Sequence, residues 1–218
     1  MNVRIGSEIR ERLPQLCVAV VEADAVNSER DDELWQLIHE EERCLQDHTG
    51  ESIKLFSGIA ATRAAYRTLG KDPSRYRPSN EALCRRIVQG KGLYRINTLV
   101  DLCNLASMRF HYSIGGFDRS KIVGDVELGI GRAGEPYEGI GRGSLNIDCL
   151  PVYRDALGGI GTPTSDNERT KIGLDTNETI FFVNGFDGDR EQTLCCAAFI
   201  QQLLQRFARS DGGTVTTL

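Results

Sequence analysis

Three polar residues on one face of a predicted helix have the types and spacing for substrate binding or acid–base chemistry. Asn97, Asp101 and Asn104 are three or four positions apart in a segment whose apolar residues repeat with helical spacing. Residues at this spacing lie on one side of a helix. A carboxylate can take a proton from water, and amides can orient a substrate, so this face is a candidate wall of a pocket. The alternative is a structural role in capping and in hydrogen bonds to a neighbouring loop.

A second group of candidates lies in the segment 161–171, which is dense in hydroxyl groups. Glycine and proline restrict its turns, and rigid loops are frequent carriers of binding residues. Thr162, Thr164 and Asp166 lie in this loop, which is therefore a candidate binding surface. A plain surface loop is the alternative.

Metal, dinucleotide and covalent chemistry have little support. His39 is followed by Glu-Glu-Glu-Arg-Cys and lacks the two-histidine spacing of a zinc-binding helix, while Cys44 and His48 have no second pair. The Gly-x-Gly-x-x-Gly string at 129–134 precedes Glu-Pro-Tyr, which cannot open the helix that would hold a pyrophosphate. No serine sits in a nucleophile elbow. We therefore expect neither a metal nor an organic cofactor.

The charge distribution indicates a polyanionic partner. The formal net charge is −5, but the segment 63–95 holds nine Lys or Arg residues against only Asp72 and Glu81. Local charge of this kind is typical of a surface that binds phosphates. Alternatively, Arg75 and Arg77 pair with Glu81 and with the acidic helix of the segment 22–51. The residues predicted to form an exposed electropositive face are Arg63, Arg67, Arg75, Arg77, Arg85 and Arg86.

Apolar periodicity and capping residues predict helices first and strands later. Helices are expected from residue 33 onward and over 57–69, 78–88, 98–108 and 190–209, with caps at Ser57 and Thr98 and a frayed tail at 212–213. Strands are expected over 16–21, 121–130, 144–152, 156–160 and 179–184. Their close spacing favours antiparallel hairpins, and the grouping of elements indicates an α+β fold.

Length and composition suit one globular unit outside the membrane. The chain has 218 residues, 40% of them hydrophobic, and no apolar stretch that resembles a signal peptide or a membrane span. Its seven cysteines include no Cys-x-x-Cys pair, which favours reduced thiols buried among apolar neighbours. We expect a cytoplasmic protein.

Several of these stretches together resemble the B3/4 domain of the phenylalanyl-tRNA synthetase β subunit, in a free-standing form. The resemblance spans residues 57–189 and rests on 75–83, 90–104, 116–118 and 161–170, followed by 179–182. It implies a β-sandwich-like core flanked by helices. The implied organisation is an N-terminal strand and acidic helix over 1–56 packed on the same unit, the B3/4 domain over 57–189, and a C-terminal helix and tail over 190–218.

The resemblance also implies a function. In the synthetase, this domain holds a pocket where water hydrolyses tRNA(Phe) wrongly charged with tyrosine. By this resemblance, Phe117 and Asn184 join the substrate-binding candidates, and Asn97, Asp101, Phe117, Thr164 and Asp166 should converge on one cleft. The chain departs from the synthetase in carrying Gly115 where the synthetase has a histidine, and Val183 or Asn184 where it has a glutamate. Water activation would then fall to Asp101, Asp166 or the substrate itself.

Three functions remain open at this stage. The first is a tRNA-binding protein with no expected affinity for DNA, and the second is a deacylase that acts on a mischarged aminoacyl-tRNA in trans. The third is a non-catalytic module that binds a small molecule or a protein and reuses the fold.

Overall fold

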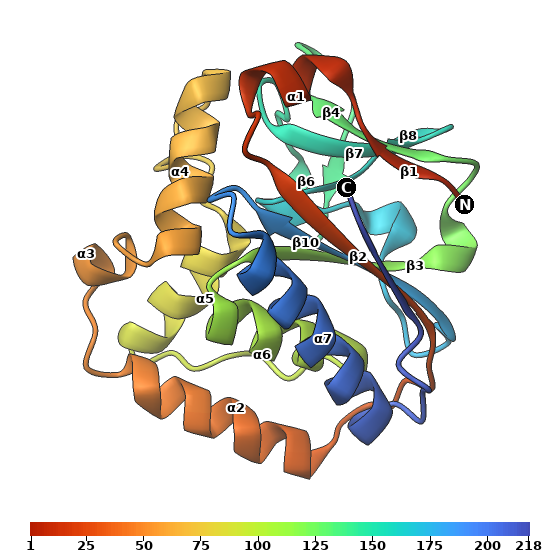
Figure 1. Ribbon diagram of the computed structural model, residues 1–218. Helices are drawn as coiled ribbons and strands as arrows, with labels where there is room; N and C mark the ends of the chain where they lie inside the picture. The colour runs from red at the N-terminus through yellow and green to blue at the C-terminus, as the bar shows by residue number, and fades with distance from the viewer.

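Two β-sheets and a layer of helices are stacked in the computed structural model of the protein, which describes residues 1–218 (Figure 1). The five-stranded sheet has the order β1 (Val3–Ile5), β4 (Val126–Ile130), β7 (Pro151–Asp155), β8 (Gly158–Thr162) and β9 (Ser165–Asp166). The four-stranded sheet has the order β11 (Thr214–Thr217), β2 (Cys17–Asp24), β10 (Glu178–Gly185) and β3 (Ser113–Asp118). A small hairpin pairs β5 (Glu138–Gly139) with β6 (Gly143–Ser144). The predicted α+β fold with a sandwich-like core flanked by helices is confirmed.

The four-stranded sheet is the middle layer, because its alternate residues enter two different cores. Along β10, Phe181 and Val183 pack in the core beneath the helices, whereas Ile180 and Phe182 pack in the core between the two sheets. This is the two-residue period expected of a strand that is covered on both faces.

Seven helices surround these sheets, and most long ones follow the predicted pattern. The helices are α1 (Ser7–Arg12), α2 (Asp32–Leu45), α3 (Gly50–Ile53), α4 (Ser57–Leu69), α5 (Ser79–Val88), α6 (Thr98–Phe110) and α7 (Arg190–Phe207). Helix α4 ends at Gly70, whose φ of 97° is left-handed and therefore suits glycine. Helix α5 begins directly after Pro78, as expected for a residue with a fixed φ. None of the helices is long and apolar enough to cross a membrane.

Five local predictions were wrong. The expected strands over 121–130 and 144–152 begin only at Val126 and Pro151. The tail is not frayed, since β11 pairs antiparallel with β2. The short strand β1, which was not predicted, pairs parallel with β4. The caps also differ from expectation: Phe56 precedes α4 without a side-chain cap, and the Asn97 side chain caps α6 by accepting a hydrogen bond from the Val100 N–H.

Candidate binding cleft

A cleft of about 550 Å³ opens between α5, α6, β3 and the loops near β9. Its walls are mainly apolar, with Leu83, Ile114 and Ile172 among the lining side chains. Polar groups are few and come from separate elements. They are Ser79, Arg86, Asn104, Ser107, Arg142, Thr164, Asp166 and Lys171. A mostly apolar hollow with a small number of convergent polar groups is typical of a ligand site.

Helix α6 lines the cleft with a face next to the one predicted. Val100, Cys103, Asn104 and Ser107 line it, at the spacing of one helical face. Of the predicted polar stripe, only Asn104 is on this face. Asn97 and Asp101 do not line the cleft.

The carboxylate of Asp101 instead joins α6 to α2. Its Oδ2 accepts a hydrogen bond of 2.6 Å from the Trp35 indole N–H, and its Oδ1 accepts one of 3.1 Å from the Ile96 N–H. Burial raises the pKa of Asp101 above its usual value, although the bond from Trp35 opposes this. The geometry therefore gives Asp101 a structural role and leaves it no route to a substrate in the cleft.

Three further substrate-binding candidates lie in the interior. Phe117 is buried in the core between the sheets, 5.5 Å from the ring of Phe182. The Thr162 hydroxyl accepts hydrogen bonds from the N–H groups of Thr164 and Ser165 and so holds the turn after β8. Asn184 accepts a hydrogen bond of 2.6 Å from the Tyr153 hydroxyl. The expected convergence of Asn97, Asp101 and Phe117 on the cleft is therefore contradicted.

Thr164 and Asp166 do meet in the cleft, as predicted. The Thr164 hydroxyl shares a hydrogen bond of 2.9 Å with the Tyr66 hydroxyl and donates one of 3.2 Å to the Tyr76 carbonyl, so it is fixed in place. Asp166 accepts a single hydrogen bond of 3.3 Å, from the Gly116 N–H of the other sheet. Burial raises the pKa of Asp166 to about 8, so its carboxyl group is mostly neutral at pH 7.

Gly115 has no room for a side chain as the core is packed. A Cβ atom there would lie 2.8 Å from a ring carbon of Phe117 and 3.4 Å from Oδ1 of Asp166. A histidine at this position would require the Phe117 ring to move. The packing of Phe117 and Asp166 therefore requires glycine at position 115.

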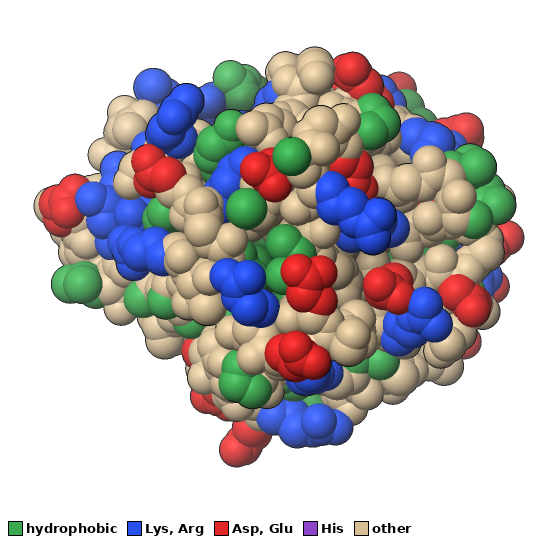
Figure 2. Space-filling model, turned by 90° about the horizontal axis from the view of Figure 1, so that it is seen from above, with side chains coloured by type: hydrophobic (Ala, Val, Ile, Leu, Met, Phe, Trp, Pro, Cys, Tyr) green, Lys and Arg blue, Asp and Glu red, His purple; other side chains and the backbone are tan.

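The predicted arginine face is only partly exposed. Arg67, Arg75 and Arg77 are exposed, and Figure 2 shows Lys and Arg side chains gathered on the side where α4 lies in Figure 1. Arg86 is half-buried and lines the cleft, with its guanidinium 3.7 Å from the centre of the Tyr94 ring. Its Nε is buried and has no hydrogen-bond partner.

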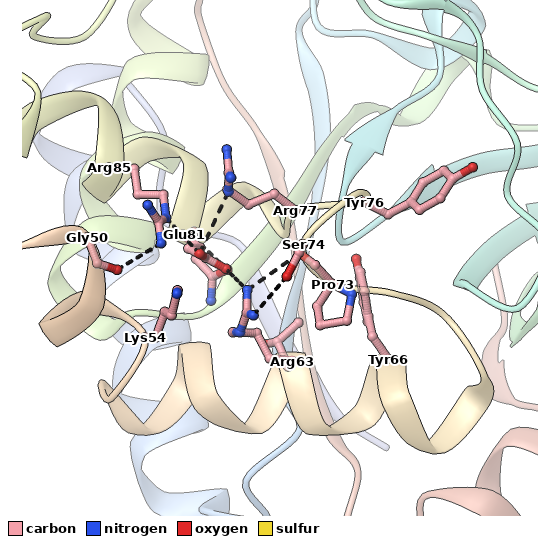
Figure 3. Close-up of polar contacts among 12 residues, drawn as sticks. Gly50, Lys54, Arg63, Tyr66, Pro73, Ser74, Tyr76, Arg77, Glu81 and Arg85 are labelled. Carbon is pink, nitrogen blue, oxygen red and sulfur yellow. Dashed lines mark hydrogen bonds and ion pairs between the residues drawn. The ribbon is translucent and has the colours of Figure 1, made fainter.

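Two of the six arginines, the buried Arg63 and the half-buried Arg85, pair with Glu81 (Figure 3). Arg63, only 6% exposed, donates a hydrogen bond of 2.7 Å to one carboxylate oxygen of Glu81, and Arg85 donates one of 2.7 Å to the other. Arg77 approaches the same carboxylate at 3.7 Å from the solvent side. Exposure of Arg63 and Arg85 was therefore a wrong prediction, because their charges are neutralised inside the fold. The alternative pairing with Glu81 holds for Arg77.

Two cations of the cleft were not among the predicted site residues. Arg142, from the turn between β5 and β6, and Lys171 both line it and are exposed. The glycines around Arg142 indicated a tight turn, and Lys171 ends the hydroxyl-rich segment. That Arg142 and Lys171 line the same cleft as Arg86 is apparent only in the folded structure.

The comparisons with known proteins agree with this architecture. The model of the B3/4 domain family matches residues 61–210. Among solved structures, the fold is similar to an N-terminal fragment of the phenylalanyl-tRNA synthetase β-subunit from Pyrococcus horikoshii, at 16% sequence identity and a TM-score of 0.49. That similarity covers 98% of this chain but 50% of the other, so this chain spans about half of that fragment. A search of curated proteins finds no match. Since the family model covers well over half of its residues, the chain belongs to the B3/4 domain family.

Proposed function

We propose that the cleft binds the aminoacylated end of a tRNA and promotes hydrolysis of the ester. The observation that carries this proposal is the composition of the cleft, in which apolar walls meet three cationic side chains, Arg86, Arg142 and Lys171. The apolar walls suit an amino acid side chain, and the cations suit the phosphates of an RNA terminus. We propose tRNA as the RNA because the solved structure with a similar fold is a fragment of phenylalanyl-tRNA synthetase.

Arg86 is the cation best prepared to receive a ligand. Its guanidinium lies against the Tyr94 ring, which restricts its motion, and its Nε has no acceptor within the protein. A buried donor without a partner is costly, and an acceptor on a ligand removes that cost. We assign Arg86 to a phosphate or to the ester carbonyl.

In this proposal, hydrolysis depends on positioning more than on a general base. Asp101 lies outside the cleft, and in the free protein Asp166 carries its proton at pH 7 because of its raised pKa. Holding an ester carbonyl and a water in reacting geometry is itself a large source of rate enhancement. Arg86 and the hydroxyl groups of Ser79 and Ser107 are the side chains in the cleft available for this.

The deacylase proposal is tested with a panel of mischarged tRNAs. We expect release of the amino acid from at least one of them at a rate at least about tenfold above spontaneous hydrolysis, and Arg86→Gln to lower it by about 10²-fold, as for loss of one charge-stabilising donor. Glu138→Gln is the matched control, because Glu138 is exposed and does not line the cleft. Spontaneous rates across the whole panel would contradict hydrolysis and favour a non-catalytic binding module.

Binding of the tRNA body is assigned to the exposed arginines Arg67, Arg75 and Arg77. Each phosphate contact releases a counterion, so the double variant Arg75→Gln/Arg77→Gln should reduce the slope of log K against log salt by about 1.5–2. Fluorescence titration of uncharged tRNA between 50 and 200 mM salt measures this. Arg4→Gln is the control, since Arg4 is exposed on β1 and pairs with Glu127. An unchanged slope together with a lower melting temperature would mean that the two arginines only stabilise the fold.

A further inference from the structure

Asp166 is the only acidic side chain that lines the cleft, and it has no cationic partner. No Lys, Arg or His residue forms an ion pair with it, although three cations line the same cleft. Its Oδ2 accepts one hydrogen bond, from the Gly116 N–H, and its Oδ1 accepts none. The acids elsewhere in the chain with a lowered pKa each have a lysine or arginine partner, as Asp155 and Glu135 do.

The surroundings of Asp166 leave one oxygen free. Gly115 and Gly161 flank Oδ1, and a Cβ on either would lie 3.4 or 3.0 Å from it. The backbone approaches this oxygen at both glycines, and no side chain donates a hydrogen bond to it. An unpaired carboxyl group with one free oxygen at the wall of a cleft is costly unless a ligand completes it.

We propose that Asp166 binds the α-ammonium of the aminoacyl group, while Arg86, Arg142 and Lys171 hold the anionic part of the same ligand. This inference rests on the proposed function. It gives the cleft two ends of opposite charge: Asp166 binds the cationic group of the ligand, and the arginines bind its phosphate. A free amino ester satisfies both ends, whereas an N-acylated ester leaves Asp166 unpaired. Asp166 is then a binding residue that selects for a free amino group.

Binding at this site is coupled to proton release. The free protein carries a proton on Asp166 below pH 8 because burial raises its pKa to about 8, and forming the ion pair removes that proton. Affinity should therefore rise by up to about tenfold per pH unit between pH 5 and 7. It should fall above about pH 8, where an α-ammonium loses its own charge.

The titratable groups that interact with Asp166 are one cysteine and two tyrosines. Cys103, Tyr137 and Tyr153 face it from α6, the β4–β5 loop and β7, and burial raises the pKa of each above its usual value, so they stay neutral. The remaining charged side chains that line the cleft are Arg86, Arg142 and Lys171, and Lys171 pairs with Glu168. None of the three histidines lines the cleft.

The test compares stable ligand analogues with free and blocked amino groups. The probes are 3′-aminoacylamino-3′-deoxyadenosines with aromatic, aliphatic and polar side chains, each with its N-acetylated counterpart, measured by calorimetry in two buffers of different ionisation enthalpy. We expect acetylation to weaken binding by about 10- to 100-fold, the value of a charge-assisted hydrogen bond. Binding of the free amine at pH 6.5 should release about one proton.

The variant Asp166→Asn should lose both the preference for the free amine and the proton release. Asparagine retains an acceptor for the Gly116 N–H, and the control Glu138→Gln removes a negative charge outside the cleft. Equal binding of free and acetylated analogues by the wild-type protein would overturn the role of Asp166 and leave the proposed function in place. Binding of neither analogue would overturn both. The wild-type comparison decides the matter even where the variant does not fold.

Discussion

Replacing Glu81 with alanine should lower the free energy of unfolding by about 3–5 kcal/mol, the range for breaking a buried ion pair. Glu81 is fully buried, and each of its carboxylate oxygens accepts a 2.7 Å hydrogen bond from an arginine. Without it, Arg63 and Arg85 keep their charges in a place with little access to water. For a chain of this length the loss corresponds to about 10 °C in melting temperature. Thermal and denaturant unfolding measure it directly.

Two neighbouring substitutions provide controls for Glu81→Ala. Arg77→Ala should cost less than about 1 kcal/mol, because Arg77 is exposed and 3.7 Å from the carboxylate. Glu51→Gln should cost less still, since Glu51 is exposed and pairs with Lys54 at the surface. If Glu81→Ala lowered the free energy of unfolding as little as either control, the ion pairs of Glu81 with Arg63 and Arg85 would not hold α4 against α5.

Local structure was predictable where a few adjacent residues determine it. The bounds of α4 and α5 follow from Gly70 and Pro78, whose backbone preferences act within one turn. The apolar pattern of β10 likewise identified a buried strand. In contrast, the C-terminal strand β11 is four residues long and exists because β2 offers it a free edge. No pattern within those four residues could reveal that pairing.

Which face of α6 lines the cleft is decided by the elements that pack against the helix. The sequence of α6 alone therefore did not predict the lining residues correctly. Asp101 and Asn104 were correctly placed on α6 and Asn97 caps it, but the Asp101 carboxylate bonds to Trp35 of α2 and does not line the cleft. Because these two residues are 66 positions apart, their contact cannot be read from spacing. Thr164 and Asp166 were predictable because they are two positions apart, in the turn after β8 and in the short strand β9 that follows it.

The sequence spacing of two arginines relative to Glu81 indicates that they pair with it. Arg77 and Arg85 each lie four positions from Glu81, the spacing at which opposite charges meet along a helix. This pattern favoured pairing over a free electropositive face. Arg63 carries no such signal, since it reaches Glu81 from another helix. The cations that line the cleft come mainly from loops, whose positions only the complete sheet arrangement defines.

Filling the cleft should separate recognition of the aminoacyl group from binding of the tRNA body. Ala82 is half-buried on α5 and lines the cleft, so Ala82→Trp places an indole ring in a space of about 550 Å³. Overlap with the ligand cannot be relieved without displacing α5, and we expect affinity for a 3′-aminoacylamino-3′-deoxyadenosine to fall by at least about 100-fold. Release of amino acids from mischarged tRNA should be lost in parallel.

The matched control is Ala64→Trp, which adds the same ring at an exposed position of α4 outside the cleft. Ala64→Trp should change neither the affinity for the analogue nor the release of amino acids from mischarged tRNA. The melting temperatures of both variants should lie within a few degrees of that of the wild type. Uncharged tRNA should bind Ala82→Trp with nearly unchanged affinity and salt dependence, because the exposed arginines Arg67, Arg75 and Arg77 remain. If a folded Ala82→Trp variant bound the analogue as tightly as the wild type, the aminoacyl site would lie elsewhere. If it lost uncharged tRNA as well, the cleft and not the arginine surface would carry RNA binding.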